Sequence, residues 1–256
     1  MIRRLLDWLR RRKAARIEVS AEAWTRVEAQ LPFLNHLGTA DRVRLRELAL
    51  QFLAEKQMSG ARGLSLQPEM QLCIAVQACL PILELGLDWY RGWVGIVVYP
   101  GDFVIPRQEM DESGIVHEFD DAVLGEAWLG GPVLLSWFEH SRDAAGINVV
   151  IHEFAHKLDM LNGDADGLPP LHAGMSKAAW GNAFGRAYAD FGKRVADSEL
   201  SGEELALDPY AAEAPAEFFA VMSEAFFETP ALLMTEYPDV YEQLRAFYRQ
   251  DPASPG

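Results

Sequence analysis

The chain has 256 residues, of which 50% are hydrophobic and 11% aromatic, so it can bury a sizeable core and is not a disordered protein. Its formal charge is −15, from 38 acidic and 23 basic residues, and this excess of negative charge argues against direct binding of nucleic acid. No stretch approaches the roughly 18 uninterrupted apolar residues of a membrane span, so no transmembrane segment is expected.

The N-terminal segment, residues 1–20, is basic: its first 16 residues carry seven basic side chains and one acidic one. It lacks the continuous apolar stretch and the small-residue cleavage site of a secretory signal. Its apolar stripe opposite the arginines fits a helix on a membrane surface or a terminal helix that frays or docks on the protein itself, and we favour the second interpretation. We assign residues 21–250 to a single domain and residues 251–256 to a loose tail.

Apolar residues recur at helical spacing in the ranges 21–31, 39–57 and 69–80, which predicts three helices. Thr39 is expected to cap the second helix. Cys73 and Cys79 lie in the third helix without the spacing of a zinc site. We interpret them as buried reduced thiols, which fits a cytoplasmic location.

The pattern then changes to short apolar or β-branched runs between turns, at 93–100, 103–105, 114–119, 125–129 and 133–138. These runs predict a small, mostly antiparallel sheet. The run 133–138 is equally compatible with an interior strand and with an open edge along which an extended peptide could pair. Helical spacing then returns in a motif helix that begins after Gly146, and in 176–195, 215–228 and 240–249. This order indicates an α+β fold that is mostly helical.

Residues 152–156 read His-Glu-Phe-Ala-His within an apolar run that stops at Asn162-Gly163. A helix places residues four apart on one face, so His152 and His156 can both present a ring nitrogen to one zinc ion. Glu153 can then reach a water on the open side of the metal and act as its base.

Chance alone would produce these three positions in roughly one protein in a hundred of this size. Two histidines and a glutamate inside an apolar helix are costly to bury without a partner, however, and a metal ion supplies one. We therefore favour a zinc site over a chance or purely structural pair.

A catalytic zinc ion usually has three protein ligands and a water, so a third ligand must come from another segment. Asp159 follows His156 by three residues on the same helix, and a side chain that close usually points past the metal. We expect Asp159 to accept a hydrogen bond from a histidine or to serve the loop that follows.

Glu217 and Glu224 lie seven residues apart on the apolar helix predicted at 215–228, where Pro215 suits the first position. Carboxylates buried on such a helix need a cation or hydrogen-bond donors. Glu217 could be the third zinc ligand or a helix-start carboxylate favoured by the helix dipole, and burial alone leaves these interpretations even. Glu224 could accept the second N–H of a ligand histidine.

The chain also resembles a known family. The motif, Tyr210 and the segment Glu217-Phe-Phe-Ala220 are similar to the catalytic part of the Mlc titration factor A family of zinc peptidases, and the likeness extends to Gly125-Glu-Ala-Trp128 and to 131–137. More distantly, the two helices and the tyrosine resemble the protease domain of anthrax lethal factor. The closer resemblance covers most of the chain and implies a zincin-like metallopeptidase domain with one Zn²⁺.

The same resemblance implies roles for individual residues. The two motif histidines and the glutamate of the Glu-Phe-Phe-Ala segment bind zinc in that family, which implies His152, His156 and Glu217 as ligands. Glu153 would be the general base, and Tyr210 would assist catalysis by donating a hydrogen bond to the developing oxyanion. Without the resemblance, Tyr210 would be interpreted as an ordinary buried tyrosine.

His117 matches a further histidine that is linked to the metal in that family. A histidine in the open position of the metal would displace the water and hold the enzyme idle until its loop moves. Spacing alone favours a strand histidine with hydrogen bonds of its own.

The resemblance implies a zinc-dependent peptidase that acts on peptide or protein substrates, an aminopeptidase being one option. A second function of another class stays open, because the family is known for binding a transcriptional repressor of sugar uptake and taking it away from DNA. Such a role needs a surface rather than catalysis, and an acidic protein would suit a basic partner. A structural zinc site fits less well, because such sites usually have four ligands rich in cysteine.

Overall fold

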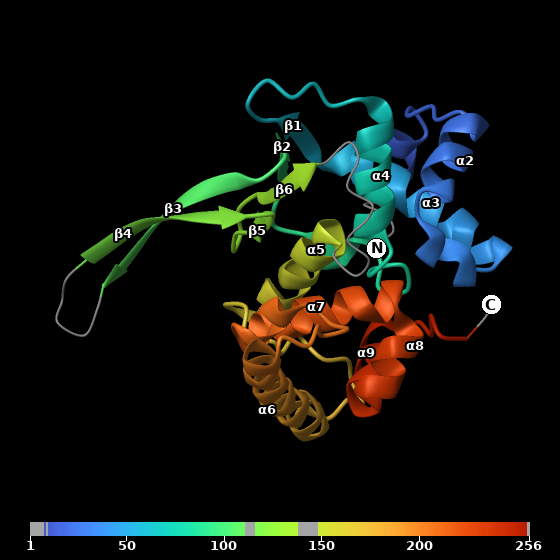
Figure 1. The fold of residues 1–256 in the computed structure, drawn as a ribbon. Coiled ribbons are helices and arrows are strands. Elements are labelled where there is room, and N and C mark those ends of the chain that lie inside the picture. Colours follow the sequence, from blue (N-terminus) through green and yellow to red (C-terminus); the bar gives the residue numbers. More distant parts are fainter. Residues whose placement is uncertain (1–7, 9, 111–115, 138–147, 255–256) are drawn as a thin grey trace.

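The computed structural model describes residues 8, 10–110, 116–137 and 148–254, and for 105–110 and 116–123 it describes the backbone alone. In the described N-terminal part of the molecule, residues 10–14 are helical and three longer helices follow (Figure 1): α2 (Ala21–Ala29), α3 (Thr39–Glu55) and α4 (Pro68–Cys79). They confirm the three predicted helices, with shifts of one or two residues at some ends. Thr39 is the first residue of α3, whereas the cap is Gly38.

The main sheet has four strands in the order β1–β2–β6–β5, namely β1 (Gln57–Gly60), β2 (Gly95–Pro100), β6 (Val133–Trp137) and β5 (Gly125–Ala127). β1 pairs with β2 and β2 pairs with β6 in parallel, whereas β5 pairs with β6 in antiparallel orientation. The sheet is therefore mixed, and the prediction of a mostly antiparallel sheet is wrong. Because β6 lies between β2 and β5, its interpretation as an open edge is also wrong.

Two features of the chain make the sheet mixed, and neither can be recognised from the local hydrophobic pattern of the sequence. β1 is not predicted because its residues continue the helical spacing of the preceding range, and α4 then provides the crossover that a parallel pair requires. Between β2 and β6, the chain leaves the sheet to form a separate antiparallel pair, β3 (Phe103–Met110) and β4 (Val116–Val123). Figure 1 shows this pair reaching away from the helices.

The motif helix α5 (Val149–Asp159) lies between the sheet and the C-terminal helices (Figure 1), in contact with α4, β5, β6 and α7. Its Phe154 is fully buried, with its ring centroid 5.1–5.7 Å from those of Phe52, Tyr90 and Trp93. This aromatic cluster fixes the rotation of α5 about its axis, so that the polar face of the helix turns toward α7.

Four helices form the C-terminal part: α6 (Lys177–Ser201), α7 (Pro215–Glu228), α8 (Pro230–Glu236) and α9 (Pro238–Tyr248). α6, α7 and α9 confirm the predicted helices, whereas α8 is not predicted. Short 3₁₀ helices join the main elements, namely η1 (Pro32–His36), η2 (Leu87–Tyr90), η3 (Met160–Asn162) and η4 (Pro209–Ala212). α7 is buried along nearly its whole length, as its apolar sequence predicts.

The two cysteines are both buried and neither forms a disulfide bond, which agrees with the prediction of buried reduced thiols. Burial raises the pKa of the Cys79 thiol well above its usual value. Within the described part of the chain, no helix is long and apolar enough to cross a membrane.

Both described ends of the chain contact the body of the protein. In the basic N-terminal segment, Arg10 pairs with Glu55 at 2.6 Å and with Asp88 at 2.7 Å. Near the C-terminus, Tyr241 donates a hydrogen bond to Asp251.

Candidate metal centre

The helix α5 carries both motif histidines on one face. Asn148 caps its first turn by accepting a hydrogen bond from the backbone N–H of Ile151 at 2.9 Å. His152 and His156 lie one turn apart, and their Nε2 atoms are 3.2 Å apart. His156 is 7% exposed and Glu153 is 4% exposed, so both polar side chains are buried, which is costly without a partner.

The helix α7 brings a carboxylate to the same point. Pro215 begins this helix, and Glu217 lies in its first turn. Glu217 Oε2 is 3.0 Å from His152 Nε2 and 3.2 Å from His156 Nε2. The structure therefore brings together the three side chains that the resemblance implies as ligands, although they come from helices about 60 residues apart in sequence.

The three atoms fit a tetrahedral zinc ion. Two ligands about 2.0–2.1 Å from zinc at a tetrahedral angle lie roughly 3.3–3.4 Å apart. The observed separations of 3.0–3.2 Å are close to this value. Among the described residues, His152, His156 and Glu217 form a cluster whose ligand atoms all lie within 4.8 Å of one another. Two histidines and one glutamate are also a ligand set of catalytic zinc.

The electrostatics of the metal-free chain favour positive charge at this point. Burial would raise the pKa of Glu217, but the hydrogen bonds from His152 and His156 outweigh it and lower this pKa to about 2. Burial would likewise lower the pKa of His152, but Glu217 and Glu224 outweigh it and raise this pKa well above its usual value. The carboxylates therefore stabilise a cation between them, whether a proton or a metal ion.

Glu224 holds His152 from the side opposite Glu217. Its Oε1 is 2.7 Å from His152 Nδ1, and its other oxygen accepts the backbone N–H of Asn148. A proton on Nδ1 that is donated to Glu224 leaves the lone pair of Nε2 free for a metal. The contact between Glu224 and a motif histidine is the one that the sequence predicts.

Glu153 is confined by the neighbouring strand. A Cβ atom added to Gly125 of β5 would lie 2.4 Å from Glu153 Oε1, so the strand backbone is in direct contact with this carboxylate. Glu153 Oε2 has no hydrogen-bond partner among the described residues. Burial raises the pKa of Glu153 to about 8 in the metal-free chain.

Tyr210 lies at the exposed side of the site. It belongs to η4, where Asp208 accepts its backbone N–H at 2.9 Å, and its ring centroid is 6.0 Å from that of His152. Its side chain is 49% exposed, so the interpretation as an ordinary buried tyrosine is wrong. A half-exposed tyrosine beside His152 can be reached from solvent.

Asp159 does not join the ligand cluster. Its Oδ2 accepts the backbone N–H of Gly167 at 2.7 Å, so it serves the loop that follows α5, the second of its two predicted roles. That loop packs on the start of α7, because a Cβ atom added to Gly167 would lie 2.5 Å from the carbonyl oxygen of Pro215. Burial raises the pKa of Asp159 to about 6. Asp159 thereby supports the turn of α7 that carries Glu217.

The histidine predicted as an additional ligand, His117, lies in β4, where its backbone is in register with Glu109 of β3. The side chains of this part of the hairpin lie outside what the structure describes, so the contact of His117 with a metal stays a prediction. Residues 138–147, which precede the motif helix, also lie outside the described residues.

Sequence reasoning missed three residues that support the site. Asn148, directly before the motif helix, could have been found as a helix cap. Lys157 donates hydrogen bonds to the Trp128 and Gly131 carbonyl oxygens next to β5, and it could have been found on the same helix face because it follows Glu153 by four residues. Gly125 carries no such local signal, because its contact with Glu153 joins a strand to a helix.

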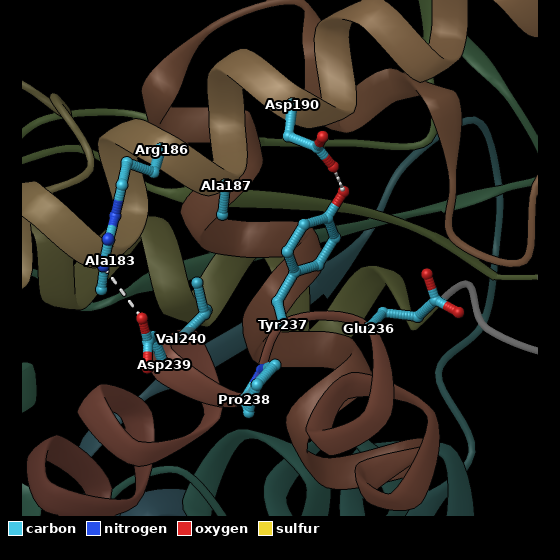
Figure 2. A pocket seen from close by; sticks show the side chains of 9 residues that line it. All are labelled: Ala183, Arg186, Ala187, Asp190, Glu236, Tyr237, Pro238, Asp239 and Val240. Carbon is cyan, nitrogen blue, oxygen red and sulfur yellow. Dashed lines mark hydrogen bonds and ion pairs between the residues drawn. The ribbon is translucent and has the colours of Figure 1, made fainter.

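A hollow away from these ligands lies between α6 and the junction of α8 and α9 (Figure 2). Its volume is about 260 Å³, and its lining consists of Ala183, Arg186, Ala187, Asp190, Glu236, Tyr237, Pro238, Asp239 and Val240. Several of its polar groups bond one another, since Arg186 donates to Asp239 at 2.9 Å and Tyr237 donates to Asp190 at 3.1 Å. None of its lining residues belongs to the cluster of His152, His156 and Glu217.

Comparison with known proteins agrees with this geometry. A family model described as glucose-regulated metallo-peptidase M90 matches residues 5–249. The chain is 39% identical over 225 residues to Mlc titration factor A of Klebsiella pneumoniae subsp. pneumoniae, covering 87% of this chain and 84% of that protein. It is 40% identical over 229 residues to Mlc titration factor A of Salmonella arizonae, covering 87% and 89%. These matches confirm the resemblance seen in the sequence, and the chain belongs to the M90 family of glucose-regulated metallo-peptidases.

Proposed function

We propose that the chain is a zinc-dependent peptidase that hydrolyses bonds in peptide or protein substrates. The observation that carries the proposal is the convergence of one atom each from His152, His156 and Glu217, with Glu153 on the same helix as the histidines. The description of the family as metallo-peptidases supports it. Bound to these three side chains, one Zn²⁺ would lower the pKa of a water molecule to about 7 and polarise a substrate carbonyl.

Each of the remaining residues has a role of its own in this proposal. Glu153 accepts a proton from the attacking water and passes it to the leaving amine. Tyr210 donates a hydrogen bond to the oxygen that becomes negative, and Glu224 keeps His152 oriented. His117 is proposed to hold the metal centre idle until the β3–β4 hairpin moves.

The proposal is tested by metal analysis combined with a cleavage assay. The protein is purified without added zinc, its metal content is measured, and it is incubated with a panel of chromogenic amino-acid and peptide substrates. We expect about one zinc ion per chain and hydrolysis that a chelator abolishes and zinc restores. Substrates with a free N-terminus, compared with blocked ones, distinguish an aminopeptidase from an endopeptidase.

Glu153→Gln is the most informative variant, because it keeps the shape of the side chain and all three ligands. It should retain zinc and lose nearly all hydrolysis, since an amide cannot accept the proton. Glu213→Gln, at an exposed carboxylate next to η4, is the matched control and should keep full activity. Undiminished turnover by Glu153→Gln, or a protein that binds no zinc, would contradict the proposal.

A second candidate function is the sequestration of a repressor. The relatives at 39–40% identity are named Mlc titration factor A, so their name says that they titrate Mlc. The formal charge of −15 would suit a partner with a basic surface. Glu153→Gln separates the two functions, because binding of a repressor should survive this change and hydrolysis should not. Both functions accord with a cytoplasmic location, which we propose from the two buried cysteines that form no disulfide bond.

A further inference from the structure

Two buried lysines lie against the same tryptophan ring. Lys157 of α5 is 3% exposed, and Lys56, which directly follows α3, is 8% exposed. Their ammonium nitrogens are 4.9 Å and 3.5 Å from the centroid of the Trp93 ring. Each ammonium also donates two hydrogen bonds to backbone carbonyl oxygens. Because burial of an ammonium group is costly, each lysine depends on these contacts.

The two lysines hold different parts of the fold. Lys56 donates at 2.5 and 2.7 Å to two carbonyl oxygens in the segment just before β2. Lys157 donates at 2.5 Å to the carbonyl oxygen of Trp128 and at 2.8 Å to that of Gly131, both in the turn between β5 and β6. The turn is closed by a further bond from the Gly131 N–H to the Trp128 carbonyl oxygen. Lys157 therefore ties the motif helix to the end of β5.

The strand that Lys157 holds is the one that confines Glu153. β5 contacts α5, and a Cβ atom added to Gly125 would lie 2.4 Å from Glu153 Oε1. Glu153 Oε2 has no hydrogen-bond partner among the described residues. Packing against the β5 backbone thus contributes strongly to the position of this carboxylate.

We propose that Lys157 is a positioning residue for Glu153: by holding the β5–β6 turn against α5, it keeps the carboxylate where it can accept a proton from water. Lys157 follows Glu153 by four residues, so both lie on the face of α5 that β5 covers. A small shift of a catalytic group lowers the rate steeply, because the reacting atoms must meet within a narrow range of geometry. The proposal rests on the proposed peptidase function.

The test compares Lys157→Met with Lys56→Met. Both changes remove a buried ammonium from the Trp93 ring together with its two hydrogen bonds to backbone carbonyl oxygens, so both should lower the melting temperature. In the zinc-loaded protein, Lys157→Met should lower kcat roughly tenfold or more. Lys56→Met should leave kcat within about twofold, since it holds no element that borders Glu153. Zinc affinity should be unchanged in both variants, because neither lysine contacts a ligand atom.

Amide hydrogen exchange supplies a readout that does not depend on activity. Exchange at Gly131 and Trp128 should accelerate by about tenfold or more in Lys157→Met and stay unchanged in Lys56→Met. Equal losses of kcat in the two variants, or unchanged exchange in the turn of Lys157→Met, would overturn the proposal. Should the Met variants fail to fold, Lys157→Gln and Lys56→Gln make the same comparison with a smaller expected loss of kcat, because glutamine keeps N–H donors but is shorter and has no charge.

The wild-type assay separates this proposal from the proposed function. Absence of chelator-sensitive hydrolysis in the wild-type protein would overturn the peptidase function, and with it the positioning role of Lys157 in catalysis. In that case, the hydrogen-exchange comparison alone would still test whether Lys157 holds the β5–β6 turn in place.

Discussion

Glu224 Oε1 lies 2.7 Å from His152 Nδ1, while Glu217 Oε2 lies 3.0 Å from His152 Nε2, so one imidazole is held between two carboxylates of the same helix. The two glutamates are seven residues apart on α7, which is two helical turns. α7 therefore carries one proposed metal ligand, Glu217, and also holds the ring of another, His152, on a different helix.

The role of Glu224 predicts a loss of zinc affinity in Glu224→Gln. An amide is a weaker acceptor for the Nδ1 proton and fixes the ring less firmly, so affinity should fall about 10–100-fold. Glu228→Gln is the matched control, because Glu228 lies one turn further along α7 and accepts from the Asn148 side chain without touching a ligand. Competition with a chelating dye measures both, and equal affinities of the two variants would exclude an orienting role for Glu224.

Gly125→Ala should impair catalysis without removing zinc. The new methyl group would lie 2.4 Å from Glu153 Oε1 and would displace this carboxylate, whereas no ligand atom is affected. We expect kcat to fall by about 100-fold. Gly95→Ala in β2 is the control, because its Cβ atom would meet only Pro132 at 3.4 Å. The assay is steady-state hydrolysis with parallel zinc analysis, and full activity of Gly125→Ala would show that the contact does not position Glu153.

Tyr210→Phe should lower kcat with little change in KM. The hydroxyl is proposed to bond the oxygen that becomes negative in the transition state, and the loss of one such donor costs about 100–1,000-fold in kcat. The ring remains, so its packing beside His152 is preserved. Tyr188→Phe is the control, because that hydroxyl donates to the Ala212 carbonyl oxygen, away from the ligands. A tyrosine with only a packing role would leave kcat unchanged in both.

The stability of the metal-free protein should depend on pH through Glu153. Its pKa is raised from 4.5 to about 8 in the folded chain by burial, so the unfolded chain releases this proton first. Folding stability therefore falls as the pH rises between these two values and levels off above the upper one. At acidic pH the carboxyl group is protonated in both states, and the effect is absent.

Glu153→Gln removes this dependence, because the amide does not titrate. The metal-free variant should match the wild-type protein near pH 4.5 and exceed its stability by an amount on the order of a few kcal/mol near pH 8. Urea unfolding of chelator-treated protein at both pH values measures the difference. A stability difference that is the same at both would show that Glu153 does not carry the raised pKa.

The part of the site that is local in sequence could be predicted. His152 and His156 lie four residues apart, so helical geometry alone places them together once α5 forms. The role of Glu217 was harder to predict. The helix and its first turn follow from Pro215 and the apolar pattern, but burial alone supports a zinc ligand and a helix-start carboxylate equally. Only the resemblance favoured Glu217 as a metal ligand. Only the packing of α7 on α5 shows that Glu217 Oε2 lies 3.0 Å from His152 Nε2.

The sheet shows where local patterns stop being informative. The runs of apolar residues identified most strands, because alternation and β-branched residues are properties of the strand itself. Pairing direction is a property of two strands and of the chain between them, and short intervals between runs suggested an antiparallel sheet. The crossover through α4 and the excursion of the β3–β4 hairpin made the main sheet mixed instead.

The sequence by itself determined most of the helices, the spacing of the motif and the chemistry that two imidazoles and a glutamate can perform. The tertiary structure alone decided which strand borders Glu153, which carbonyl oxygens Lys157 binds, and that Tyr210 faces solvent. The physical reason is the separation along the sequence of the groups that interact. Helical periodicity is set by hydrogen bonds between residues four apart, whereas these contacts join distant segments that only the burial of the core brings together.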